Sequence, residues 1–329
     1  MTIEEVARHF TELTVDRPDR FEEMAGAVYA FQRAHNRVYG QYSTNQDIPY
    51  LPVEAFKRAA ITSFPSEEAE RVFESSGTGQ SVPGKHYVRR LAVYEKAVIV
   101  HFEAVFGTGP FTLVAHLPHY AERGQQSSLL YMVETLIRRY GDDHSGFFLD
   151  DQTLLERAVA HSRAEATPLL LFGAAFGLLD LIDDADVPLP ATARVIETGG
   201  MKTYRRAISR ADLHRRLAEG FGVPEAQVWS EYGMCELMSQ CYTRGGPVFF
   251  PPPWMRFRIV DPEHPDREMP EGRPGALALF DLANLYSVSA LLTEDRAVRR
   301  SEGFEVLGRL SQAELRGCNF LLEAKHLDV

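Results

Sequence analysis

The chain of 329 residues has 45% hydrophobic residues, enough to bury a sizeable core, and we expect one large domain with at most a small appendage. Its net charge of −11 and its lack of a basic cluster argue against a nucleic-acid partner, because neutralising phosphates needs a concentrated Lys/Arg surface. The three cysteines make no disulfide framework and are typical of a reducing compartment. The acidic N-terminus lacks a targeting segment, and the longest apolar run, 168–179, is too short to span a bilayer. We therefore expect a cytoplasmic protein with no membrane span.

Apolar residues at three- and four-residue spacing predict two amphipathic helices between Ile3 and about Val38, separated by Pro18 and acting as a lid or brace for the core. Short apolar strands then alternate with helical stretches, at 71–74 and 87–106, 111–116 and 127–140, 169–172 and 174–184, and 194–198 and 211–221. Such alternation indicates an α/β fold with a mainly parallel sheet. Ser209 and Asp212 are expected to cap the last of these helices, and Gly222 to end it.

After Gln240 proline-rich turns separate short predicted strands, at 255–260, 276–281, 290–293 and 304–307. With no long helix between them, these strands predict an antiparallel β region near the C-terminus.

A hydroxyl- and glycine-rich loop lies between Glu74 and Lys85, and contains Ser75, Ser76, Gly77, Thr78, Gly79, Gln80, Ser81 and Gly84. Glycines let backbone N–H groups approach an anion, while the hydroxyls and the lysine add donors and charge. The composition predicts a clamp for the phosphates of ATP. Such loops also occur as plain flexible turns, so the prediction depends on the motifs further along the chain.

Further polar segments come after strands or turns, in order along the chain. They are Leu117-Pro118-His119-Tyr120, Glu197-Thr198-Gly199-Gly200, Ser230-Glu231-Tyr232-Gly233-Met234-Cys235-Glu236, Leu292-Thr293-Glu294-Asp295-Arg296, Gly308-Arg309 and Leu315-Arg316-Gly317-Cys318. Leu292–Arg296 is expected to end a strand of the β region with a carboxylate.

These segments in this order resemble the adenylate-forming superfamily, and within it the acyl-protein synthetase (LuxE-type) and phenylacetate–CoA ligase-like branch, from about Val53 to Glu323. The resemblance implies an α/β adenylate-forming large domain with mainly parallel sheets and a truncated C-terminal domain. The expected limits are 1–307 for the large domain, with a helical N-terminal segment 1–50 and a β-rich subdomain 247–307, and 308–329 for a remnant of the C-terminal domain.

The resemblance also implies ATP and Mg²⁺, with a role for each motif. The phosphates would be held by Ser75, Ser76, Gly77, Thr78, Gly79 and Gln80. The adenine pocket would be lined by Gly199 and Gly200, and the base would be bound by Glu231, Tyr232 and Gly233. Glu236 would bind Mg²⁺, Asp295 would bind the ribose hydroxyls, and the acyl pocket would be faced by His119 and Tyr120.

The residue types suit these roles. Tyr232 offers a flat π-face, Glu236 is a hard oxygen ligand, and Asp295 can accept two hydroxyl hydrogen bonds. Arg309 can offset the charge that builds on the α-phosphate. Each residue also has a plain structural alternative, with Tyr232 as ordinary core, Glu236 as a helix-start carboxylate and Asp295 as a turn residue.

Several positions depart from the family pattern. Gln80 and the order Pro83-Gly84-Lys85 weaken the expected lysine contact to the γ-phosphate. Cys235 stands where a threonine usually precedes the metal-binding acid. Enzymes that complete adenylation with a lysine on a C-terminal domain need about a hundred more residues, a typical small-domain size.

Cys318 is the candidate acyl acceptor, because in the acyl-protein synthetase branch a cysteine near the C-terminus takes the acyl group as a thioester. A thiol with a pKa of about 8.5 is a good nucleophile, and the neighbouring Arg316 favours the thiolate. Alternatively, residues 318–322 alternate like a strand, and Cys318 is then a small buried hydrophobe.

The predicted function is ATP-dependent activation of a carboxylic acid as an acyl-adenylate, followed by acyl transfer to a thiol, with Cys318 the candidate on this chain. The expected partners are the acid and an acyl-accepting protein, a reductase or CoA. Two alternatives stay open: a biosynthetic ligase that passes the acyl group to CoA, a carrier protein or an amine, and a nucleotide-binding scaffold that has lost catalysis.

Overall fold

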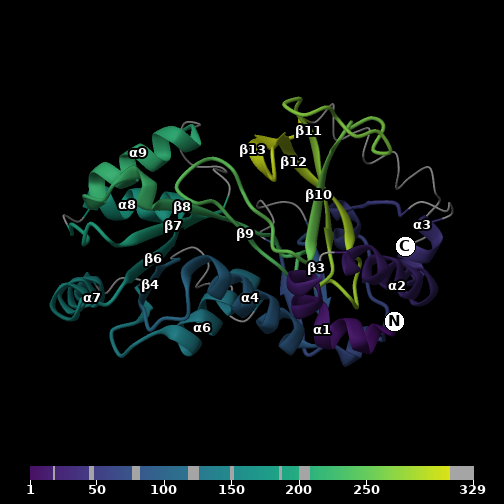
Figure 1. The fold of residues 1–329 in the computed structure, drawn as a ribbon, viewed down its shortest axis with the longest axis horizontal. Helices are drawn as coiled ribbons and strands as arrows, with labels where there is room; N and C mark the ends of the chain where they lie inside the picture. The colour runs from purple at the N-terminus through teal and green to yellow at the C-terminus, as the bar shows by residue number, and fades with distance from the viewer. Residues whose placement is uncertain are drawn as a thin grey trace. The chain divides into compact units, whose positions relative to one another are not determined.

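The computed structural model describes residues 1–17, 19–43, 48–75, 82–117, 126–148, 152–184, 187–199 and 208–311. The chain divides into two compact units (Figure 1). Unit 1 comprises Met1–Val100, Met234–Gln240 and the chain from Phe250 onward, and unit 2 comprises His101–Gly233 and Cys241–Phe249. The predicted domain limits, at residues 50, 247 and 307, stay predictions.

The described strands of unit 2 form a sheet in the order β5-β4-β6-β7-β8-β9. Pairing is parallel from β5 through β8, and β9 is antiparallel to β8. The strands are β4 Thr112–His116, β5 Gly146–Phe147, β6 Leu169–Ala174, β7 Arg194–Thr198, β8 Val228–Tyr232 and β9 Cys241–Tyr242. The predicted strand and helix alternation is therefore confirmed here, and it brings the carboxyl ends of β7 and β8 to one edge.

Helices cover both faces of this sheet. They are α6 Ser128–Tyr140, α7 Gln152–Glu165, α8 Ala175–Asp184, α9 Arg210–Phe221 and the short 3₁₀-helix η4 Glu225–Gln227. Figure 1 shows α8 and α9 together on one side and α6 on the other. Alternate residues of the central strands, such as Leu169 and Leu171 of β6, pack in a core cluster with α7, α8 and α9. A continuous apolar strand such as β6 is expected where both faces are covered. The sequence did not predict α7 or β5.

The ends of α9 follow the predicted signals. Ser209 Oγ accepts a hydrogen bond from Asp212 N at 3.1 Å, which caps the first turn. Gly222 ends the helix with a φ of 68°, a left-handed conformation that glycine adopts without a steric cost.

Unit 1 contains a sheet in the order β1-β12-β11-β10, with β13 paired to β12, among the described strands. The strands are β1 Leu51–Pro52, β10 Met255–Val260, β11 Gly275–Asp281, β12 Ala290–Arg300 and β13 Gly303–Arg309. β10 to β13 are antiparallel, as predicted, whereas β1 runs parallel to β12.

The helices of unit 1 include the predicted N-terminal pair. They are α1 Ile3–Asp16, α2 Arg20–His35, α3 Arg37–Tyr42, and the 3₁₀-helices η1 Val53–Lys57 and η2 Ser66–Glu68. A further helix, α4 Leu91–Phe106, begins in unit 1 and ends in unit 2. On α2 the buried residues Phe21, Met24, Ala25, Val28 and Gln32 recur at helical spacing and form one face. Phe21 lies edge-on to Phe280 of β11, with ring centroids 5.9 Å apart.

Two sequence predictions in unit 1 are wrong. The stretch predicted as a helix from residue 87 begins as a strand, β3 Lys85–Val88, which pairs antiparallel with β2 Arg71–Glu74, and α4 starts only at Leu91. The strand predicted at 290–293 continues to Arg300, because β13 pairs with its second half. Asp295 therefore lies within a strand and not at its end.

Within the described part of the chain, no helix is long and apolar enough to cross a membrane.

Candidate functional site

The base of the predicted phosphate loop extends the β2–β3 hairpin. Ser75 N donates to Gly84 O at 2.9 Å, and Gly84 N donates to Ser75 Oγ at 2.8 Å. These two bonds close the chain on either side of the loop and fix where it leaves and rejoins the hairpin. Ser76, Gly77, Thr78, Gly79 and Gln80 lie outside the described residues, so their predicted phosphate contacts stay predictions.

Glu236 lies beside this base. A Cβ atom added to Gly84 would meet Glu236 Oε1 at 3.0 Å, Ser75 Oγ at 3.3 Å and Phe56 Cβ at 3.5 Å. A side chain at position 84 would press on the carboxylate, which would have to shift by a few tenths of an ångström. The structure brings Glu236, the predicted metal ligand, to the closed end of the loop predicted to hold phosphates.

The environment of Glu236 combines burial with nearby charge. Burial raises the pKa of Glu236 to about 7, the positive charges of Arg309 and Lys57 lower it, and the negative charge of Glu294 raises it. Near neutral pH the group is poised between its acid and carboxylate forms, so a further cation at the carboxylate would favour ionisation.

Asp295 and Arg309 form an ion pair across β12 and β13. Arg309 Nε lies 3.0 Å from Asp295 Oδ1, and Arg309 Nη1 lies 3.0 Å from Glu294 Oε2. The two strands place Asp295 directly opposite Arg309, next to a register shift after Arg296. Asp295 is buried, and its carboxylate is of the kind that can accept hydrogen bonds from a diol.

Lys57 is a cation of this region that the sequence did not single out. It ends η1, and its Nζ lies 2.7 Å from Glu54 Oε2. Burial lowers the pKa of Lys57, but Glu54, Glu294 and Glu236 raise it by more, so the net shift is upward. Lys85, by contrast, pairs with Glu74 at 3.6 Å across the hairpin and is half-exposed. No motif in the sequence marks Lys57, which lies near the start of the region, from about Val53, that resembles the family.

In unit 2 a buried carboxyl sits at the adjoining ends of β7 and β8. Thr198 and Glu231 are register partners, and the Thr198 hydroxyl donates to Glu231 Oε2. Burial raises the pKa of Glu231 to about 7, the hydrogen bond from Thr198 lowers it, and the charge of Glu197 raises it. The parallel sheet thus brings together two segments that the sequence predicted separately.

Tyr232 follows at the end of β8 and contacts Phe249, with ring centroids 5.6 Å apart. The guanidinium of Arg210 lies 4.7 Å from the Phe249 centroid, and its Nε lies 3.7 Å from Glu197 Oε1. Gly199 has a φ of 84°, so the turn after β7 needs a glycine. Gly233 is the last residue of this unit before the chain returns to unit 1.

The remaining predicted residues, Gly200, His119, Tyr120 and Cys318, lie outside the described residues. The roles predicted for all site residues stay predictions.

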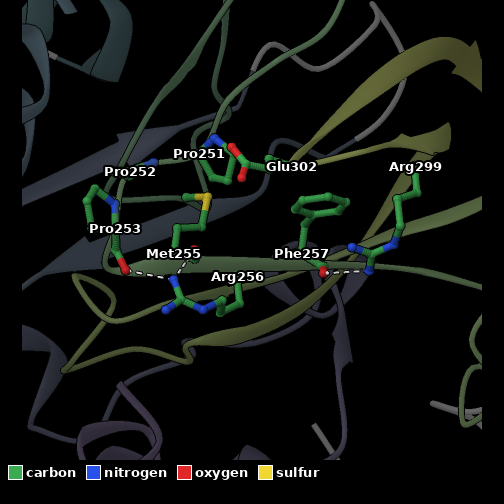
Figure 2. A pocket seen from close by; sticks show the side chains of 8 residues that line it. All are labelled: Pro251, Pro252, Pro253, Met255, Arg256, Phe257, Arg299 and Glu302. Atoms are coloured by element: carbon green, nitrogen blue, oxygen red, sulfur yellow. Dashed lines mark hydrogen bonds between the residues drawn. The ribbon is translucent and has the colours of Figure 1, made fainter. Parts of the chain in front are cut away.

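A pocket of about 270 Å³ in unit 1 has a different lining. Figure 2 shows its residues, which are Pro251, Pro252, Pro253, Met255, Arg256, Phe257, Arg299 and Glu302. Its two arginines are held by backbone carbonyls, Arg256 by Pro253 O at 2.7 Å and Arg299 by Phe257 O at 3.4 Å. The pocket contains none of the predicted site residues.

The residues around Glu236 fit a magnesium ion held jointly with a polyphosphate. Within the described ranges no three His, Cys, Asp or Glu side chains gather into a metal centre. Mg²⁺ usually takes one or two carboxylates and completes its shell with phosphate oxygens and water. A buried carboxylate at the base of the loop predicted to hold phosphates meets that need.

Comparisons with known proteins agree with this geometry. The family model described as "Acyl-protein synthetase, LuxE" matches residues 134–326, more than half of the 329 residues. No curated protein matches the chain.

Among solved structures, the chain is similar to 2-hydroxyisobutyryl-CoA ligase in complex with its acyl-AMP and CoA, at 12% identity and a TM-score of 0.63, covering 92% of this chain and 72% of that one. It is also similar to ATP-bound MatB from Rhodopseudomonas palustris, at 17% identity and a TM-score of 0.54, covering 75% of this chain and about half, 49%, of that one. At these identities the likeness shows the fold, which is that of adenylate-forming enzymes.

The fold and the family model together confirm the predicted resemblance and the predicted fold class. They support an enzyme of the kind that forms acyl-adenylates and transfers acyl groups. The chain belongs to the acyl-protein synthetase (LuxE) family of adenylate-forming enzymes.

Proposed function

We propose that the chain uses ATP to activate a carboxylic acid as an acyl-adenylate and then transfers the acyl group to a thiol. Two facts within unit 1 carry this proposal: the Glu236 carboxylate lies beside the Ser75–Gly84 loop base, and while burial raises its pKa, the charge of Arg309, which pairs with Asp295, lowers it. Family membership supports the same chemistry.

In the first step a carboxylate oxygen of the acid attacks the α-phosphorus of ATP, and pyrophosphate leaves. Mg²⁺, when bound, offsets the charge of the phosphates. Glu236 would hold the ion as a carboxylate, which costs little at neutral pH because its pKa is about 7. Arg309 would oppose the charge that builds on the α-phosphate, and Asp295 would accept the ribose hydroxyls.

In the second step a thiolate attacks the acyl carbonyl carbon, a thioester forms, and AMP leaves. Cys318 is the proposed acceptor, as the resemblance implies. CoA is the second candidate acceptor, because a structure with the same fold is described in complex with CoA and an acyl-AMP.

The test of activation is acid-dependent exchange of labelled pyrophosphate into ATP. We expect exchange with at least one acid from a panel of long-chain, aryl and amino acids. No exchange with any acid, in protein shown to be folded and to bind the acids, contradicts the proposal.

The test of transfer uses Cys318→Ser beside Cys241→Ser, which removes a buried thiol in β9 as a control. With a labelled acid and ATP, we expect Cys318→Ser to keep pyrophosphate exchange and to lose the hydroxylamine-sensitive acyl-protein adduct, whereas Cys241→Ser keeps both. An adduct that survives Cys318→Ser overturns the assignment, and acyl-CoA formed in its place supports CoA.

A further inference from the structure

We infer that His86 and Asn284 are positioning residues for Glu236, because each holds one of two successive backbone carbonyls, those of Cys235 and Glu236, and so aims the Glu236 carboxylate at the base of the loop. This inference deepens the proposed function and rests on the proposed role of Glu236 as a magnesium ligand. Neither residue belongs to the motifs on which the family resemblance was built.

His86 links the loop's outgoing strand to the Cys235 carbonyl. It is 1% exposed in β3, two residues after Gly84, and its Nδ1 lies 2.8 Å from Cys235 O. Burial lowers the pKa of His86 to about 4, so the ring is neutral at physiological pH. Because a carbonyl oxygen can only accept, Nδ1 carries the proton and donates to it. The Phe56 ring meets the imidazole nearly edge-on, with centroids 5.7 Å apart, and limits its rotation.

Asn284 holds the next carbonyl from another element. Its Nδ2 donates to Glu236 O at 2.8 Å, and the side chain is buried in the loop between β11 and β12. That loop is itself fixed from α2, because Gln32 Nε2 donates to Asn284 O at 2.8 Å and to Leu285 O at 3.1 Å. Helix α2 therefore holds the loop that carries Asn284, and through Asn284 the segment that carries Glu236.

The turn after Glu236 is held independently. Asp281 accepts hydrogen bonds from Met238 N at 3.1 Å and from Ser239 Oγ at 2.8 Å, and Trp254 Nε1 donates to Ser239 Oγ at 2.9 Å. These contacts keep residues 238 and 239 in place when His86 or Asn284 is changed. Substitutions at the two positioning residues should therefore move the backbone at residues 235 and 236 and leave the rest of the segment in place.

The expected loss of metal affinity can be estimated from metal sites in other proteins. Groups that orient a metal ligand typically contribute about 10- to 100-fold in metal affinity when they are removed. A residue that acts only on overall stability would weaken ATP binding to the same degree with and without Mg²⁺. A residue that acts through Glu236 would weaken only the part of ATP binding that depends on the ion.

The experiment is calorimetric titration with ATP, in Mg²⁺ and in EDTA, of full-length variants that melt cooperatively by circular dichroism. We expect His86→Leu and Asn284→Leu to lose about 10- to 100-fold in Mg²⁺-dependent affinity, with affinity in EDTA unchanged. His86→Asn, whose amide can donate in place of Nδ1–H, should keep most of the Mg²⁺-dependent affinity. Asn284→Asp, similar in size but without the donor, carries the test if the leucine variant fails to fold.

Ser287→Ala is the matched control. It removes another buried hydrogen bond from the same loop to a backbone carbonyl, Ser287 Oγ to Ile61 O at 2.9 Å, and that carbonyl is not in the Glu236 segment. We expect it to bind Mg²⁺-ATP as the wild type does. On a Glu236→Gln background, His86→Leu should cost nothing further, because its effect passes through the carboxylate.

Equal losses in Mg²⁺ and EDTA, or a full additional loss on the Glu236→Gln background, would show a structural role and overturn the inference. An unchanged Mg²⁺-dependent affinity in folded His86→Leu and Asn284→Asp overturns it as well. If the wild type itself binds ATP no better with Mg²⁺, the proposed role of Glu236 fails first and the inference fails with it.

Discussion

Glu236 in unit 1 and Glu231 in unit 2 are both buried carboxyls with a pKa of about 7, yet their surroundings differ. The pKa of Glu236 is held down in part by the cations Arg309 and Lys57. Glu231 is held by the neutral hydroxyl of Thr198, and the charge of Glu197 raises its pKa. Burial thus gives both carboxyls a pKa of about 7, but nearby cations favour the carboxylate of Glu236, whereas a nearby anion favours the protonated acid of Glu231.

The largest expected effect is that of a substitution at Glu236, which should separate the roles of the two carboxyls. Glu236→Gln keeps the size of the side chain but removes the charge, and we expect pyrophosphate exchange to fall about 1000-fold, since a catalytic metal contributes several kcal/mol. Glu231→Gln is the matched control and should leave the Mg²⁺ dependence of ATP binding unchanged. Equal losses of Mg²⁺ dependence in the two variants would contradict the distinction between the two carboxyls.

The next largest effect is expected on the rate of adenylation, from a substitution at Arg309. Arg309→Ala removes the guanidinium that pairs with both Asp295 and Glu294, and we expect kcat of adenylation to fall about 100-fold, as for loss of one preorganised electrostatic donor. Arg309→Lys should restore part of the rate, because it keeps the charge but loses the fork geometry. If KM for ATP rises while kcat is unchanged, Arg309 acts in ground-state binding and the proposed role at the α-phosphate is wrong.

A substitution at Lys57 tests whether nearby positive charge contributes to binding at Glu236. Lys57→Met keeps the length of the side chain and removes a charge coupled to Glu236 and Glu294, and we expect about a tenfold loss in affinity for Mg²⁺-ATP at low salt. The loss should shrink as ionic strength rises. Lys85→Met, which removes the half-exposed cation paired with Glu74, is the control and should have the smaller effect. Reversal of that order would assign the phosphate contact to Lys85.

The smallest effect is on stability and concerns Glu231. Its pKa rises from 4.5 to about 7 on folding, so the folded chain keeps a proton that the unfolded chain releases. The stability from this group is complete below pH 4.5 and is lost as the pH rises through about 7. Glu231→Gln removes this dependence, and we expect its melting temperature to exceed that of the wild type by about 2–4 °C near pH 8 but not near pH 5. Calorimetric scans at both values check this, and a constant difference would contradict it.

The parts of the fold that the sequence predicted are those decided locally. Ser209 and Gly222 bound α9 as expected because caps depend on a few neighbouring residues, and β7 has the bounds, 194–198, that were predicted for it. The sequence predicted both polar segments but not the meeting of Thr198 with Glu231, which the parallel pairing of β7 and β8 produces.

The parts that could not be predicted depend on residues distant in the chain. Asp295 lies mid-strand because β13 pairs with β12 and supplies Arg309, although a run of charged residues disfavours a strand. β3 forms because β2 pairs with it, and its residues fit a helical pattern equally well. Lys57, His86 and Asn284 carry no motif, and only the folded chain places them around the Glu236 segment.

The most direct test of the central claim is a crystal structure of the full chain with ATP and Mg²⁺. We predict that the metal contacts the Glu236 carboxylate and that a phosphate oxygen lies within hydrogen-bonding distance of the loop that begins at Ser75. Clear density for the nucleotide elsewhere, with Glu236 bound to neither metal nor phosphate, would contradict the account.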